Sequence, residues 1–194
     1  IMATELRGPQ TFFMPFNQGS NGAGQVGGKG NPEAPEGQYT TSYLWERVLN
    51  RRMLLCILQR YISLQEEERI SIHKTTDGKI KQDKKKSVKI IFPRYHQLDV
   101  VEKLLADTAE HGSGKNYLIQ HSAGSGKSNS IAWVAYRLGA LQNAELKPMF
   151  NCVFVITDRR ILNSQLQKTI LGFDHVDGTV ETVKDSDPST KLKT

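Results

Sequence analysis

A short apolar run that leads into a glycine turn ending in Lys-Ser constrains the fold of this chain more than any other feature. Residues 116–128 read NYLIQHSAGSGKS, which predicts a buried strand followed by a tight loop. Gly124 and Gly126 permit backbone conformations in which successive N–H groups converge on an anion. Apolar residues then recur at helical spacing from Ile131 to Leu138, so a helix N-terminus should point at the same anion.

This order of strand, loop and helix predicts a phosphate-binding loop that holds ATP and Mg²⁺. The residues expected to contact the nucleotide are Ala123, Gly124, Ser125, Gly126, Lys127 and Ser128. Lys127 would place its charge on the β and γ phosphates, and Ser128 would give its hydroxyl to Mg²⁺, so both are also the candidate catalytic residues. The alternative is a Gly-Ser turn that happens to precede Lys-Ser, since His121 stands where such loops usually begin with a small residue.

Two further elements extend the pattern to an α/β fold. Residues 152–156 form a continuous apolar run, as expected for a strand covered on both faces. Leu162, Leu166 and Ile170 follow at four-residue steps, and residues 98–105 give another helix upstream. The alternation predicts a parallel sheet with flanking helices and a ligand site at the carboxyl ends of the strands.

Residues 92–97, FPRYHQ, precede the first of these helices. A glutamine amide offers one acceptor and two donors in a plane, which is enough to read the edge of adenine. The segment resembles the glutamine motif of superfamily 2 helicases and translocases, which implies Gln97 on the adenine edge and Arg94 or Tyr95 near the base. The alternative is a polar cap on an ordinary helix.

A closer resemblance covers nearly the whole chain. Residues 92–101, 116–131 and 155–162 resemble the motor entry of the R subunit of type I restriction enzymes, and residues 13–19 and 41–46 are similar to the segment joining its nuclease and motor domains. The resemblance implies a partial RecA-like P-loop domain that supplies the ATP-binding part of an ATP-dependent DNA translocase and endonuclease. It also implies double-stranded DNA and the methyltransferase and specificity subunits as partners.

By the same resemblance, a motif after the second strand faces the DNA backbone: Thr157, Asp158, Arg159 and Arg160. The implied division is a glycine-rich arm over 1–40 that follows a nuclease domain, a helical connector and basic hairpin over 41–91, and the start of the motor over 92–194. The acidic magnesium-binding pair and the second-domain arginines of such motors are not recognisable here. We therefore expect a piece of a larger polypeptide that does not hydrolyse ATP alone.

Two other interpretations stay open. The chain could belong to another superfamily 2 DNA helicase, or it could be a nucleotide-responsive docking module that presents its helical connector to partner subunits. The basic run at 79–89, after a predicted turn at 77–78, is either a DNA-contacting arm or a solvated hairpin end. The tetrapeptide at 112–115 repeats the GSGK of the phosphate loop, but it ends a predicted helix and is expected to be a C-cap turn.

Composition limits the cellular setting. The formal charge of +6 and a pI near 9.3 are compatible with a polyanionic partner. Cys56 and Cys152 both lie in apolar runs and form no paired framework, so a reducing cytoplasm is expected. The sequence shows no signal peptide and no apolar span of membrane length, and no membrane partner is expected.

Overall fold

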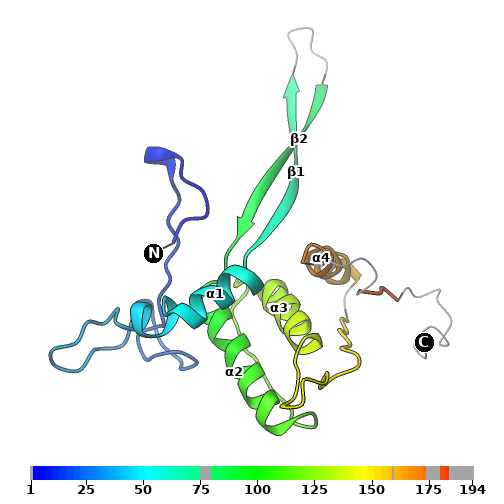
Figure 1. The fold of residues 1–194 in the computed structure, drawn as a ribbon. Coiled ribbons are helices and arrows are strands. Elements are labelled where there is room, and N and C mark those ends of the chain that lie inside the picture. Colours follow the sequence, from blue (N-terminus) through cyan, green and yellow to red (C-terminus); the bar gives the residue numbers. More distant parts are fainter. Residues whose placement is uncertain (1, 75–79, 159, 174–179, 184–194) are drawn as a thin grey trace.

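The computed structural model describes residues 2–74, 80–158, 160–173 and 180–183. The elements follow one another as η1 (Gly8–Gln10), η2 (Leu44–Val48), α1 (Arg51–Arg60), β1 (Ser63–Lys74), β2 (Ile80–Ile91), α2 (Tyr95–His111), α3 (Lys127–Gly139) and α4 (Arg160–Leu171). Helices α1, α2 and α3 form the body, α4 lies beside α3, and the β1–β2 ribbon extends away from the helices (Figure 1).

The core lies between the inner faces of α1, α2 and α3. Trp133 of α3 is only 1% exposed, and its indole Nε1 donates a hydrogen bond of 3.1 Å to the carbonyl of Tyr61 at the end of α1. Val101 of α2 and Ile57 of α1 are buried in the same cluster. Apolar residues at helical spacing thus give each helix one buried face, as the sequence pattern predicts for α2 and α3.

A charged group joins the same three helices at the edge of the core. The Glu102 carboxylate of α2 accepts hydrogen bonds from the Tyr61 hydroxyl at 2.6 Å and from Arg137 of α3 at 2.8 Å. Burial, followed by the bond to Glu102, raises the pKa of the Tyr61 phenol, which therefore stays protonated. The carboxylate is thus satisfied by one neutral and one charged donor.

Helix α4 and the residues after it pack on the face of α3 that carries Trp133 and Tyr136. Leu166 and Ile170 are buried, and the Phe173 ring lies 5.7 Å from that of Trp133. The Tyr136 hydroxyl donates to the carbonyl of Ile170 at 3.1 Å. The helix predicted from apolar residues at four-residue steps is therefore present, and it extends the core beyond α3.

The connector is not the single helical stretch that the sequence predicts. The π-helical turn η2 ends at Val48, and Asn50 then acts as the N-cap of α1, where its side chain accepts a hydrogen bond of 2.9 Å from the Met53 amide. Asparagine is among the preferred N-cap residues because its side chain satisfies a free amide of the first turn. The chain therefore changes direction here and starts a second helix.

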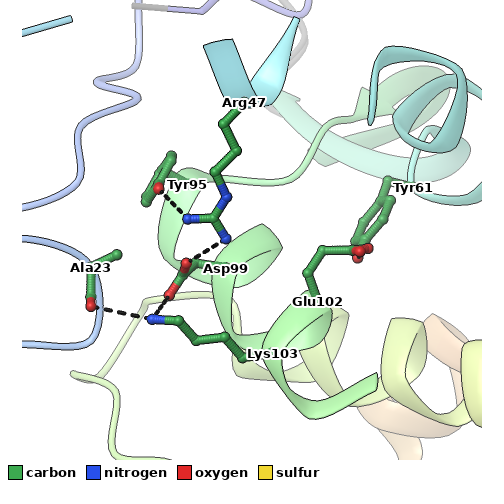
Figure 2. Close-up of polar contacts among 7 residues, drawn as sticks. All are labelled: Ala23, Arg47, Tyr61, Tyr95, Asp99, Glu102 and Lys103. Atoms are coloured by element: carbon green, nitrogen blue, oxygen red, sulfur yellow. Dashed lines mark hydrogen bonds and ion pairs between the residues drawn. The ribbon is translucent and has the colours of Figure 1, made fainter. Parts of the chain in front are cut away.

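A polar bridge fastens the connector and the arm to α2 (Figure 2). Arg47 of η2 donates to the Tyr95 hydroxyl at 3.0 Å and to the buried Asp99 carboxylate at 2.9 Å. Lys103 pairs with the second oxygen of Asp99 at 2.8 Å and donates to the Ala23 carbonyl in the arm at 3.3 Å. One buried carboxylate thus organises three segments that lie far apart in the sequence.

The hairpin segment is a long two-stranded antiparallel ribbon. Its register runs from Ser63 paired with Ile91 at the base to Lys74 paired with Ile80. The predicted turn at 77–78 lies outside the described residues. A hairpin thus occupies the segment in which the sequence predicts one.

The predicted parallel sheet is wrong for the described residues. The sheet that they contain is the antiparallel β1–β2 ribbon, and the apolar runs at 116–120 and 152–156 are not strands. A strand requires a neighbouring strand for its backbone N–H and C=O groups, and none of the described segments pairs with these runs as a strand. Leu118 and Ile156 are accordingly 95% and 91% exposed.

None of the described helices combines the length and apolar character needed to cross a membrane.

Replacing Trp133 with alanine should destabilise the chain severely. The substitution removes a fully buried ring and its hydrogen bond to Tyr61, and should cost about 3–5 kcal/mol in the free energy of unfolding. The matched control is Trp45→Ala, because Trp45 is 51% exposed and its ring meets that of Tyr39 near the surface. This substitution should cost under about 1 kcal/mol. Urea unfolding followed by circular dichroism checks both, and equal losses would contradict this core.

Candidate nucleotide-binding site

The glycine loop turns tightly into the start of α3. Gly124 and Gly126 take positive φ angles of 72° and 81°, and Gly126 is the N-cap of the helix. Lys127 and Ser128 lie in the first turn of α3. The backbone N–H groups of a first turn have no carbonyl partner within the helix. The loop thus ends in free backbone donors at the positive end of a helix, the arrangement that binds phosphate.

Lys127 folds its side chain back over this loop. Its Nζ donates to the carbonyls of His121 at 2.8 Å and Ser122 at 3.0 Å, both at the opening of the loop. The ammonium group is therefore held at the mouth of the loop by two weak neutral acceptors. A phosphate oxygen is a stronger, charged acceptor for the same donors.

Gln97 connects the start of α2 to the loop. The residue is 3% exposed, and its Oε1 accepts a hydrogen bond of 2.8 Å from the Arg94 amide. Its Nε2 donates to the carbonyls of Gly126 at 2.8 Å and Ser125 at 3.3 Å. A Cβ on Gly126 would lie 2.5 Å from this Nε2, so the contact itself requires glycine at that position.

A histidine beside Gln97 holds the loop from the same side. The Nε2 of His96 lies 3.0 Å from the carbonyl of Ser125, so this nitrogen carries the proton. The rings of His96 and His121 meet edge to face at 4.9 Å. Burial lowers the pKa of His96, and burial followed by the Lys127 charge lowers the pKa of His121, so both rings are neutral near pH 7.

Unpaired buried polar atoms gather around the loop. Among the described residues, the buried side-chain atoms that lack a hydrogen-bond partner are Arg94 Nε, His121 Nδ1, Ser125 Oγ and Ser130 Oγ. Buried polar groups are normally satisfied, so a cluster of exceptions calls for a partner. The phosphates of a nucleotide, with several strong acceptor oxygens, fit the donors in this set and the free amides of the loop. Ser128, half-buried in the first turn of α3, could supply a hydroxyl to Mg²⁺.

The predicted site residues not yet described are Ala123 and the segment from Thr157 to Arg160. Ala123 is exposed in the loop. Thr157 is half-buried and Asp158 exposed ahead of α4, Arg160 begins that helix, and Arg159 lies outside the described residues. Within the part of the chain that the structure describes, no hydrogen bond joins Thr157 or Asp158 to the phosphate loop. Their contact with DNA stays a prediction.

Sequence reasoning assigned no role to His96. Its signal was its position next to Gln97, in the first turn of the helix that precedes the loop. The contact with Ser125 depends on how α2 and α3 pack, which no local pattern specifies.

Comparison with known families gives one match. The family model described as SWI2/SNF2 ATPase matches residues 96–193, just over half of the chain. The chain belongs to the SWI2/SNF2 ATPase family. The matched region begins at His96 and includes the glycine loop, α3 and α4, which makes it a segment of a superfamily 2 ATPase. The comparison with curated proteins gives no match, and the comparison with solved structures gives none either.

Alanine at Gly126 should cost more stability than alanine at Gly124. Both positions have positive φ and should each cost about 1–2 kcal/mol of unfolding free energy. Gly126→Ala also displaces the Gln97 amide and should cost about 1 kcal/mol more. A Cβ on Gly124 meets nothing within 4 Å, which makes Gly124→Ala the matched control. In a Gln97→Ala background the difference should vanish, so a difference that persists there would contradict the contact.

Acid should destabilise the chain through His96 and His121. Both have lowered pKa values in the folded state, so the unfolded state takes up protons first as the pH falls below 6.5. Stability should be retained above that value and fall as the pH drops from about 6.5 towards the lowered pKa values of the folded state. Thermal unfolding across this range should show a shallower fall for His96→Gln, while His111→Gln, at the exposed end of α2, leaves the fall in place. An unchanged slope in His96→Gln would contradict the assignment.

Proposed function

We propose that this chain supplies the ATP-binding part of an ATP-dependent DNA translocase and, more narrowly, that it is part of the R subunit of a type I restriction enzyme. The ATP-binding proposal rests on the hydrogen bonds that Gln97 and His96 make with the loop that precedes Lys127. Membership of the SWI2/SNF2 ATPase family supports ATP as the nucleotide.

Each loop residue has a distinct role in this proposal. The amides from Ala123 to Ser128 cradle the phosphates, and Lys127 leaves its two carbonyl partners to bind the β and γ phosphates. Ser128 gives its hydroxyl to Mg²⁺, which neutralises phosphate charge. All of these contacts form at the N-terminus of α3, so the helix dipole adds to the same attraction.

The proposed recognition of the adenine base rests on Gln97 and Arg94. Both hydrogens of the Gln97 Nε2 are directed to carbonyls of the loop, while its Oε1 accepts one hydrogen bond and keeps a second lone pair. That lone pair suits the exocyclic amino group of adenine, and it would not suit the carbonyl that guanine presents at the same place. Arg94, with its unpaired Nε nearby, would lie near the base.

Hydrolysis needs more than this loop. A water must be oriented and the developing charge compensated, by groups that we do not identify in this chain. The chain should therefore bind Mg-ATP without DNA-stimulated turnover, and movement of DNA would belong to the assembled motor.

The restriction-enzyme proposal rests on the residue runs at 92–101, 116–131 and 155–162. This proposal implies double-stranded DNA and the methyltransferase and specificity subunits as partners. In it, the segment from Thr157 to Arg160 faces the DNA backbone. The family match favours a second candidate, another superfamily 2 DNA motor without a restriction role.

The chain contains its own control for the phosphate loop. Gly112-Ser-Gly-Lys115 has the same four residues as the loop, but Gly112 is the C-cap of α2 and Lys115 pairs with Asp107 at 3.0 Å. Lys127→Ala should weaken Mg-ATP binding by about 10- to 100-fold, the equivalent of a charge-assisted hydrogen bond. Lys115→Ala removes the same side chain and should leave binding unchanged.

Calorimetry with Mg-ATP on both variants and the parent chain decides the assignment. A similar loss for the two lysines would show a general effect of positive charge, and no loss for Lys127→Ala would refute the phosphate loop. Circular dichroism confirms that each variant is folded before the comparison is made.

A further inference from the structure

Two histidines, His96 and His121, contact the glycine loop at its two ends and form a histidine pair. His121 stands at the opening of the loop, where its carbonyl accepts a hydrogen bond of 2.8 Å from the Lys127 Nζ. His96 lies in the first turn of α2, and its Nε2 donates at 3.0 Å to the carbonyl of Ser125. The two rings meet edge to face with their centroids 4.9 Å apart. The histidine pair therefore borders both the opening and the end of the loop.

Two polar atoms at the histidine pair lack a partner. The Nδ1 of His121 and the Oγ of Ser125 are buried, and neither makes a hydrogen bond. Ser125 as a whole is only 7% exposed. Such atoms are uncommon, because burial removes the hydrogen bonds that water would otherwise supply. A protonated imidazole has two N–H donors, so the pair would hold an added proton more easily if a ligand brought oxygen acceptors to the loop.

The charged groups that act on the histidine pair are cations, in the part of the chain that the structure describes. Burial lowers the pKa of both rings. The His121 ring and then Arg94, the N-cap residue of α2, lower the pKa of His96 further, and Lys127 of α3 lowers that of His121 further. An anion bound at the loop would supply the negative charge that this environment lacks.

We propose that the histidine pair couples nucleotide binding to protonation, so that the pair takes up a proton from solvent when Mg-ATP enters the glycine loop. The Nε2 of His96 already carries a proton, since it donates to the Ser125 carbonyl. The added proton therefore goes to the Nδ1 of His96 or to the unprotonated ring nitrogen of His121. The inference rests on the proposed ATP site and adds a dependence on pH to it.

Two changes on binding favour the protonated pair. The phosphates bring negative charge to the loop, and an opposite charge within about 4–6 Å favours the charged form of a titratable group. Lys127 leaves the His121 carbonyl for a phosphate oxygen, whose charge offsets that of the ammonium group. The pKa of the pair is therefore higher with nucleotide than without. Affinity for Mg-ATP should then increase from about pH 7.5 to about pH 6, by at most about tenfold per pH unit for each proton taken up.

Isothermal calorimetry on the full chain measures this coupling. Mg-ATP, with Mg²⁺ in excess, is titrated at about pH 6.5 in buffers of different ionisation enthalpy, and the dependence of the heat on the buffer gives the protons taken up. The test variant carries His96→Gln and His121→Gln. The matched control is His111→Gln, at the exposed far end of α2. Protons exchanged by the nucleotide itself are common to all variants and cancel in the comparison.

The parent chain and His111→Gln should take up protons equally, with an affinity that increases as the pH falls. The test variant should take up fewer protons and show a flatter dependence of affinity on pH. Equal uptake by the parent and the test variant would overturn the proposal.

Nuclear magnetic resonance of the parent chain decides the question if the test variant loses its fold or its nucleotide binding. The ring signals of His96 and His121, assigned with single variants, are titrated with pH in the presence and absence of saturating Mg-ATP. At least one of the two pKa values should be higher with nucleotide, while that of His111 stays the same. Unchanged values for both rings of the pair would refute the coupling.

These outcomes separate the coupling from the ATP site. Mg-ATP binding that Lys127→Ala weakens, without proton uptake by the histidine pair, would refute the coupling and leave the ATP site standing. No binding of Mg-ATP between about pH 6 and about pH 7.5 would refute the ATP site, and the coupling with it.

Discussion

The candidate nucleotide site depends on one side-chain amide. Gln97 ties the first turn of α2 to the carbonyls of Ser125 and Gly126, immediately before α3 begins. The Gln97 amide is buried, and both its oxygen and its nitrogen make hydrogen bonds. The loop therefore cannot shift without leaving polar atoms unsatisfied. The position of Lys127 relative to α2 therefore follows from a residue 30 positions earlier in the sequence.

Helix α3 carries this constraint from the loop to the core. Its first turn forms the end of the glycine loop, while Trp133, less than two turns later, is fixed between Tyr61 and Phe173. A packed helix is a rigid element, so the loop and the core move as one unit. Arg137 of the same helix adds a polar link through Glu102 to α2 and to the end of α1.

The sequence predicts local structure well and long-range structure poorly. The helices at 95–111, 127–139 and 160–171 follow from apolar spacing, and the loop follows from two glycines before Lys127, because these signals are contained within a few turns. The prediction of a parallel sheet fails because a strand forms only when another segment pairs with it. The connector breaks at Asn50 through a capping preference that competes with its apolar pattern, and the role of His96 depends on how two helices meet.

The open apolar runs have a consequence for handling the protein. Leu118, Phe154 and Ile156 project to solvent from segments rich in β-branched and aromatic residues, which are the segments that pair most readily between molecules. At high concentration these segments of different molecules can align as strands, and the chain should then assemble into oligomers whose size increases with concentration and temperature. The two short stretches that flank α3 are thus the sites at which copies of this polypeptide would first associate.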